Sequence, residues 1–180
     1  MPRLFAFLRA INVGGRVVTM DVLRGHFEGL GFTAVESFIA SGNIIFTTRG
    51  RDHAALPARI EAHLHRTLGY EVHTFLRTEA EVAAVVKYRP FSPWEVEAAG
   101  ALCVGFMAAP LATATAKTVD GLRTDIDEFR VHGREIYWLC RKRQSDSKFN
   151  NNLFEKTIGG RATFRSMTTM TKLASRHLKA

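Results

Sequence analysis

The sequence predicts an α+β protein made of two successive βαββαβ units and a C-terminal helix. Short apolar runs typical of strands alternate with segments in which apolar residues recur at helical spacing. The proline-containing stretch Arg89-Pro90-Phe91-Ser92-Pro93 breaks the chain near its middle, and the same order of elements follows it again. The chain has 180 residues, 46% of them hydrophobic, which is enough for one large core or two small ones.

The first unit is predicted to contain four strands and two helices. The strands are expected at residues 3–8, 35–40, 43–47 and 72–77, and the helices at 20–30 and 52–68. Thr19 is a suitable N-cap for the first helix, and Gly31 is a suitable stop. A hairpin is expected around Ser41-Gly42. Pro57 is expected in the first turn of the second helix, where its missing N–H costs nothing.

A helix and a linker are predicted between the two units. Thr78 and Glu81 have the spacing of a capping box, and Val82, Val85 and Val86 give the helix that follows an apolar face. We therefore expect a first subdomain over 1–78, a helix and linker over 79–100, and a second subdomain over 101–180.

The second unit repeats the order of the first, although its residues do not repeat. Strands are expected at 101–108, 127–131, 135–140 and 161–165, and helices at 111–122, 149–158 and from about residue 169. Ser145, Asp146 or Ser147 is expected to cap the helix that begins at Phe149. Because βαββαβ is the order of a ferredoxin-like unit, we predict two such sheets, each with helices on one face.

Composition limits where the protein acts. Leu4–Leu8 is the only apolar run near the N-terminus, and it is shorter than a signal-peptide core or a membrane span. Cys103 and Cys140 lie singly in apolar runs, which favours buried free thiols in a reducing cytosol over a disulfide or a metal site. The sequence therefore predicts a cytoplasmic protein without a membrane partner.

The net charge of +8 is unevenly distributed, with −1 over residues 1–129 and +9 over residues 130–180. A basic third attached to a neutral remainder is typical of a protein with an anionic partner such as nucleic acid or a nucleotide. A solvated basic surface that only improves solubility is an equally good interpretation. The candidate anion contacts in this part are Lys148, Arg165, Ser166 and Lys172.

The second candidate region lies at one end of the first sheet. In a ferredoxin-like unit the first and second strands run in the same direction, so the loop after the first strand meets the hairpin after the second. Two glycine-containing loops with polar side chains then form the rim of a pocket, and backbone N–H groups there can bind an anion. A tight structural turn is the alternative. The candidate ligand-binding residues are Arg9, Asn12, Gly14, Gly15, Arg16, Ser41, Gly42 and Asn43.

Several catalytic and cofactor motifs are excluded. The Gly14-Gly15 loop has the spacing of neither a P-loop nor a dinucleotide fingerprint. Ser145-x-x-Lys148 matches the bare SxxK pattern, but its SDN and KTG partners are missing. The seven histidines have no metal-ligand spacing, and His63 and His65 are predicted to be surface residues. The sequence thus predicts no metal site and leaves any cofactor unknown.

Aromatic residues on the strands can either pack in the hydrophobic core or stack on the bases of RNA. Phe5, Phe7 and Phe46 are positioned for either role, and the absence of an RNP1-like motif around them favours the core.

Four motifs in order resemble the bacterial domain-of-unknown-function family 1697. They are Leu8-Arg9-Ala10-Ile11-Asn12-Val13-Gly14-Gly15, Ile39-Ala40-Ser41-Gly42-Asn43-Ile44-Ile45-Phe46, Ser147-Lys148-Phe149 and Arg165-Ser166-Met167-Thr168-Thr169 through Lys172-Leu173. The resemblance implies two ferredoxin-like subdomains in a cytoplasmic bacterial protein, and it implies no activity. The family usually has Gly in place of Ala10, and Asn-Trp in place of Ser166-Met167.

Two functional hypotheses follow. The first is a non-enzymatic binding module for an anionic ligand, either nucleic acid or a nucleotide. The second is an enzyme acting on a small anionic substrate at the rim, where Arg9 and Arg16 would hold the anion and backbone N–H groups would stabilise developing charge. The sequence identifies no general base for such an enzyme, so the binding module ranks first.

Overall fold

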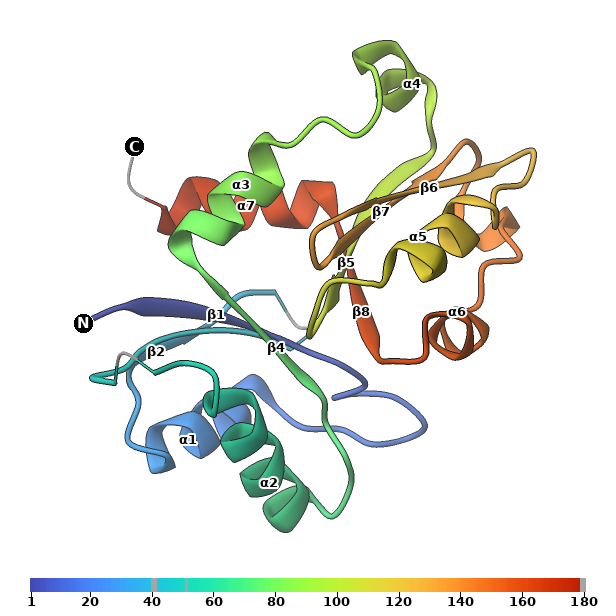
Figure 1. The fold of residues 1–180 in the computed structure, drawn as a ribbon. Helices are drawn as coiled ribbons and strands as arrows, with labels where there is room; N and C mark the ends of the chain where they lie inside the picture. Colours follow the sequence, from blue (N-terminus) through green and yellow to red (C-terminus); the bar gives the residue numbers. More distant parts are fainter. Residues whose placement is uncertain (40–41, 51, 179–180) are drawn as a thin grey trace. The chain divides into compact units, whose positions relative to one another are not determined.

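The computed structural model describes residues 1–39, 42–50 and 52–178 and confirms the predicted α+β class (Figure 1). It contains two four-stranded antiparallel sheets with interleaved helices and a C-terminal helix, consistent with two ferredoxin-like subdomains. The chain forms two compact units, residues 1–83 and residues 84–180. Among the described residues, no helix is both long and apolar enough to cross a membrane.

The first unit is built on a sheet with strand order β2-β3-β1-β4. Its strands are β1 (Arg3–Leu8), β2 (Thr33–Ser37), β3 (Asn43–Thr47) and β4 (Thr74–Thr78). Helices α1 (Met20–Gly29) and α2 (Leu56–Leu68) cover one face of this sheet (Figure 1). Leu23 and Phe27 of α1 and Ile60 and Leu64 of α2 are fully buried against alternate residues of the strands, as their helical spacing predicts.

Three boundaries in the first unit differ from the predictions. The strand expected at 35–40 is β2 and ends at Ser37, because Phe38 already turns back and donates its amide to the Asn43 carbonyl at 2.9 Å. The helix expected from Asp52 starts at Leu56, with Pro57 in its first turn. The strand expected from Val72 starts at Thr74. Thr19 is the N-cap of α1, as predicted.

The linker region contains two helices, α3 (Glu79–Lys87) and α4 (Pro93–Ala98). The capping box of α3 is confirmed, since the Thr78 amide donates to Glu81 at 2.8 Å and the Glu81 amide donates to the Thr78 hydroxyl at 3.2 Å. Helix α4 was not predicted, because six residues are too few to show a helical period.

The second unit has a sheet with the equivalent order, β6-β7-β5-β8. Its strands are β5 (Ala101–Met107), β6 (Asp127–His132), β7 (Glu135–Cys140) and β8 (Ala162–Ser166), and its helices are α5 (Thr113–Asp120), α6 (Asn151–Ile158) and α7 (Met167–His177). An aromatic cluster fills the core beneath α6, formed by Phe129, Trp138, Phe149, Phe154 and Phe164.

The start of α6 also differs from the prediction. Its N-cap is Asn150, whose side-chain oxygen accepts from the amides of Asn152 and Leu153 at 2.9 and 3.2 Å. Ser147 lies further upstream, where its hydroxyl donates to the buried carboxylate of Asp127 at 2.8 Å and accepts from the Phe149 amide at 2.9 Å. Gln144–Asp146 forms a short 3₁₀ helix, η1.

Both cysteines are free and buried, as the sequence predicted. Burial raises the pKa of Cys103 to about 11, so this thiol stays protonated at neutral pH.

Candidate anion-binding site

The two predicted loops of the first unit meet at one end of its sheet. The Leu8 amide donates to the Gly42 carbonyl at 2.8 Å. Gly42 lies so close to the loop after β1 that a Cβ atom there would be 2.9 Å from the Ile11 side chain. The expected convergence of the loop after β1 with the β2–β3 hairpin is therefore present. Ser41 lies outside the described residues.

A side-chain bridge closes the loop after β1. The Asn12 side-chain oxygen accepts from the Val18 amide at 2.7 Å, and its Nδ2 donates to the Val18 carbonyl at 3.2 Å. Residues 13–17, which we call the bridged loop, protrude beyond this pair of bonds and are exposed. Asn12 therefore shapes the loop, and its amide group is occupied by the main chain.

The tip of the bridged loop is a glycine pair in the left-handed region. Gly14 has φ 63° and Gly15 has φ 81°, and neither has an atom within 4 Å of where a Cβ would be. Within the described part of the chain, the N–H groups of Gly14, Gly15 and Val17 have no hydrogen-bond acceptor. These exposed donors can be used by an anion.

Arg16 provides a positive charge on the same loop. Its guanidinium lies 4.3 Å from the centroid of the Tyr70 ring, within cation–π range. The Tyr70 hydroxyl in turn donates to the Ile11 carbonyl at 2.9 Å, which fixes the ring against the base of the loop. Arg16 makes no ion pair with any described residue, so its charge is available to a ligand.

The remaining predicted residues of this region have structural positions. Asn43 is 1% exposed, and its Nδ2 donates to the Phe38 carbonyl at 2.9 Å, which holds the hairpin. Arg9 is half-buried, and its amide donates to the His73 carbonyl at 2.9 Å. Among the described residues of the predicted set, Gly14, Gly15 and Arg16 are therefore the ones that are exposed and have unused hydrogen-bond donors.

The loop after β7, which contains Lys148, and the end of β8, which contains Arg165 and Ser166, lie at one end of the second sheet. Ala101 pairs with Cys140 and Cys103 with Ser166, so the exits of β7 and β8 share that end. Gln144, in the loop after β7, donates to the Cys103 sulfur at 2.8 Å, which places this loop beside the exit of β8.

Of the four anion contacts predicted in the second unit, Arg165 is buried and Ser166 is half-buried. Arg165 is 8% exposed and donates to the Thr163 hydroxyl and the Phe164 carbonyl at 2.9 and 2.8 Å. Burial lowers its pKa to about 10. Ser166 is the N-cap of α7. Lys148 and Lys172 are exposed.

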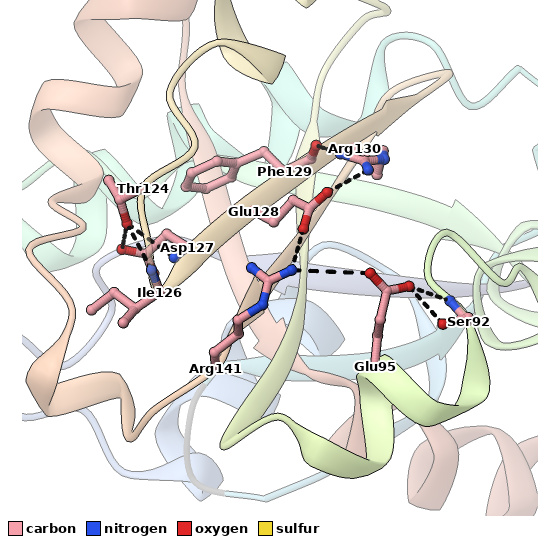
Figure 2. Close-up of polar contacts among 9 residues, drawn as sticks. All are labelled: Ser92, Glu95, Thr124, Ile126, Asp127, Glu128, Phe129, Arg130 and Arg141. Atoms are coloured by element: carbon pink, nitrogen blue, oxygen red, sulfur yellow. Dashed lines mark hydrogen bonds and ion pairs between the residues drawn. The ribbon is translucent and has the colours of Figure 1, made fainter.

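Carboxylates neutralise much of the basic third. Figure 2 shows Arg141 between Glu128, at 2.6 Å, and Glu95, at 4.0 Å, with Arg130 on the other oxygen of Glu128. The hydrogen bond from Arg141 holds the pKa of Glu128 below its ordinary value, and hydrogen bonds from Ser92 do the same for Glu95.

Two further arginines of the basic third, Arg143 and Arg161, pair with Asp146 and Glu155. The exposed cations of this third that form no ion pair with described residues are Lys142, Lys148, Lys156, Lys172 and Arg176.

Sequence reasoning missed two histidine contacts. His63 is half-buried between α1 and α2, with its Nε2 3.3 Å from Nδ1 of His26, and burial lowers its pKa. His73 lies beside Glu61 and Glu71. Both contacts join residues whose spacing matches no motif. No three His, Cys, Asp or Glu residues in the described part of the chain are arranged to hold a metal ion.

The strand aromatics occupy the core, as predicted. Phe5, Phe7 and Phe46 are each at most 1% exposed, so none is available to stack on a base.

Comparison with known proteins supports the resemblance found in the motifs. A family model described as "Protein of unknown function (DUF1697)" matches residues 1–137. A solved structure described as a conserved bacterial protein from Streptococcus pneumoniae has a TM-score of 0.74 and 25% sequence identity, and the similarity covers 99% of each chain. No match was found among curated proteins.

Proposed function

We propose that this chain, which belongs to the DUF1697 family of proteins of unknown function, is a binding module for a small anionic ligand of the nucleotide class. The ligand would bind at the bridged loop, with its anionic group on the free N–H groups of Gly14 and Gly15. Arg16 would supply the countercharge.

The difference in loop length between the two units carries this proposal. The connection after β1 has eleven residues, 9–19, whereas the equivalent connection after β5 has five, 108–112. The hairpin after β2 has five residues, 38–42, whereas the hairpin after β6 has two, 133–134. The fold needs only the shorter connections, and both extensions lie at the same end of one sheet. Loops longer than the scaffold requires are where binding residues concentrate.

The chemistry of the bridged loop suits an anion better than a reaction. Exposed backbone N–H groups and an unpaired guanidinium are both donors to phosphate or carboxylate oxygens. The contact of Arg16 with the Tyr70 ring holds the guanidinium near the loop, which reduces the entropy lost on binding. Apart from Arg16, residues 13–17 have no ionisable side chain, so the loop provides no carboxylate, imidazole or thiol for proton transfer.

Calorimetric titration with ATP, AMP and inorganic pyrophosphate tests the proposal. We expect saturable binding that Arg16→Ala weakens about tenfold, the loss of one charge-assisted interaction. Lys142→Ala is the matched control, because Lys142 is also an exposed cation without an ion pair but belongs to the second unit. Equal weakening by both substitutions, or no binding of any of the three ligands at low salt, would overturn the proposal.

Fluorescence anisotropy with short RNA and DNA over a salt series identifies the other anionic partner. A steep fall of affinity with salt that depends on Lys142 and Lys148, and not on Arg16, would assign nucleic acid to the second unit. The small-ligand proposal would then fail.

A further inference from the structure

A concave site lies in the first unit, between α2 and the segment that leads into β4. Its volume is about 250 Å³, room for about eight water molecules. Glu61 and His65 line it from α2, and Glu71 and His73 line it from the segment before β4. Small apolar side chains, among them Ala58 and Val72, form the rest of its wall.

His73 lies between the two carboxylates. Its Nδ1 is 3.9 Å from Glu61 and its Nε2 is 4.0 Å from Glu71. These distances are too long for hydrogen bonds, yet short enough for strong charge interaction. The carboxylate oxygens that face His73 therefore keep acceptor capacity, apart from the bond that the Glu61 oxygen accepts from the Thr74 amide at 2.7 Å.

The lining is acidic in a protein whose net charge is +8. With neutral histidines the pocket carries two negative charges, so it attracts a cation. The described residues provide no arrangement of three ligands for a metal ion. The apolar part of the wall suits methylene groups, which a hydrated metal ion would not use.

We propose that this pocket binds the primary ammonium group of a small alkylamine. The ammonium would donate to Glu61 and Glu71, and the methylene chain would lie against Ala58 and Val72. The site is separate from the bridged loop, and the proposal does not depend on anion binding there.

The test is a titration of the full chain with 1,4-diaminobutane, followed through the imidazole NMR signals. His73→Gln identifies the signal of His73 by its loss. At neutral pH we expect saturable shifts of the His73 signal, because the amine binds within reach of its ring. Glu71→Gln should weaken binding about two- to fivefold, as expected for an exposed ion pair.

Glu97→Gln is the matched control, because Glu97 is exposed and lies in the second unit. Sodium chloride at equal ionic strength controls for screening. If the His73 signal does not move, or moves equally in Glu71→Gln and wild type, the proposal is wrong. This result does not depend on the titrations with ATP, AMP and pyrophosphate that test the bridged loop. The two proposals can therefore fail separately.

Discussion

The two units share a scaffold and differ in what they present at equivalent ends. Both sheets have the same strand order, and both fourth strands carry a buried arginine as their fourth residue, Arg77 and Arg165. Each arginine donates to the carbonyl of the preceding residue at 2.8 Å. Only the first unit extends its loops, to eleven and five residues where the second has five and two.

This difference distinguishes the features that the βαββαβ fold requires from the loop that is added to it in the first unit. The buried stripes and capping residues occur in both units and are enough to specify a βαββαβ sheet. The bridged loop adds exposed donors and a cation without adding buried surface. The Asn12 side chain holds this loop in place although the fold does not require it. Functional experiments should therefore begin with the first unit.

The largest expected effects come from removing one core aromatic from each unit. Phe27 and Phe154 are at most 2% exposed and contact other rings. Phe27→Ala and Phe154→Ala should each lower the free energy of unfolding by about 3–5 kcal/mol. Urea denaturation measures the loss, and tryptophan fluorescence reports the second unit because Trp94 and Trp138 both lie there. If each substitution lowers the free energy of unfolding of both units equally, the units do not unfold separately.

The hairpin glycines offer a smaller and sharper contrast. Gly42 has φ 73° and a substituted Cβ would be 2.9 Å from Ile11, whereas Gly133 has φ 59° and its nearest contact would be an ordinary 3.6 Å. Gly42→Ala should cost about 2–3 kcal/mol, and Gly133→Ala only the backbone strain of about 1 kcal/mol. Thermal unfolding of the two variants decides this. Equal losses would mean that the contact with the bridged loop's base contributes nothing.

Acid should act on the two units in different pH ranges. The pKa of His63 is lowered from 6.5 in the folded state, so stability of the first unit falls as pH drops below 6.5. The pKa of Glu128 is lowered from 4.5, so its contribution in the second unit is present above 4.5 and is lost only as pH falls below that value. Solvent screening keeps the His63 effect below about 1 kcal/mol.

Amide NMR during urea titrations at several pH values follows each unit separately. His63→Gln should remove the dependence of the first unit near pH 6, while His65→Gln, at an exposed position on the same helix, should not. A first unit that keeps its pH dependence in His63→Gln would contradict the assignment.

The smallest expected effect is at Ala10, which has φ 61°. The left-handed conformation destabilises an L-residue by roughly 1–2 kcal/mol, and glycine removes this cost. The greater conformational freedom of glycine in the unfolded chain offsets part of the gain. Ala10→Gly should therefore stabilise the protein by about 0.5 kcal/mol, measured by chemical denaturation. The position explains why the resembling family usually has glycine here. A destabilised variant would show that Ala10 is unstrained.

The sequence predicted the order of elements because apolar periodicity depends only on neighbouring residues. The sequence-based predictions were wrong where contacts with residues distant in the sequence determine the position of a side chain. Ser145, Asp146, Ser147 and Asn150 are all capable N-caps, and their order in the sequence does not reveal that Ser147 bonds to the buried Asp127 carboxylate while Asn150 caps the helix. Arg165 looks like a surface cation by residue type, and its burial follows from its position in β8.

The candidate sites show the same limit. The meeting of the two loops followed from topology alone, because strand direction fixes which loops share an end. The stacking of Arg16 on Tyr70 and the position of His73 between Glu61 and Glu71 could not be predicted. These contacts join residues from separate segments of the folded unit, and their positions in the sequence match no recognisable motif.

The Asn12–Val18 bridge also makes the loop tip a place where the chain can be divided. The two bonds hold both ends of residues 13–17, and the preceding strand β1 is paired along its length with β3 and β4. If the backbone is cleaved after Arg16, residues 1–16 become a separate peptide whose strand β1 remains paired with β3 and β4. The protein is suited to fragment complementation, in which a short N-terminal strand restores the fold of the remainder.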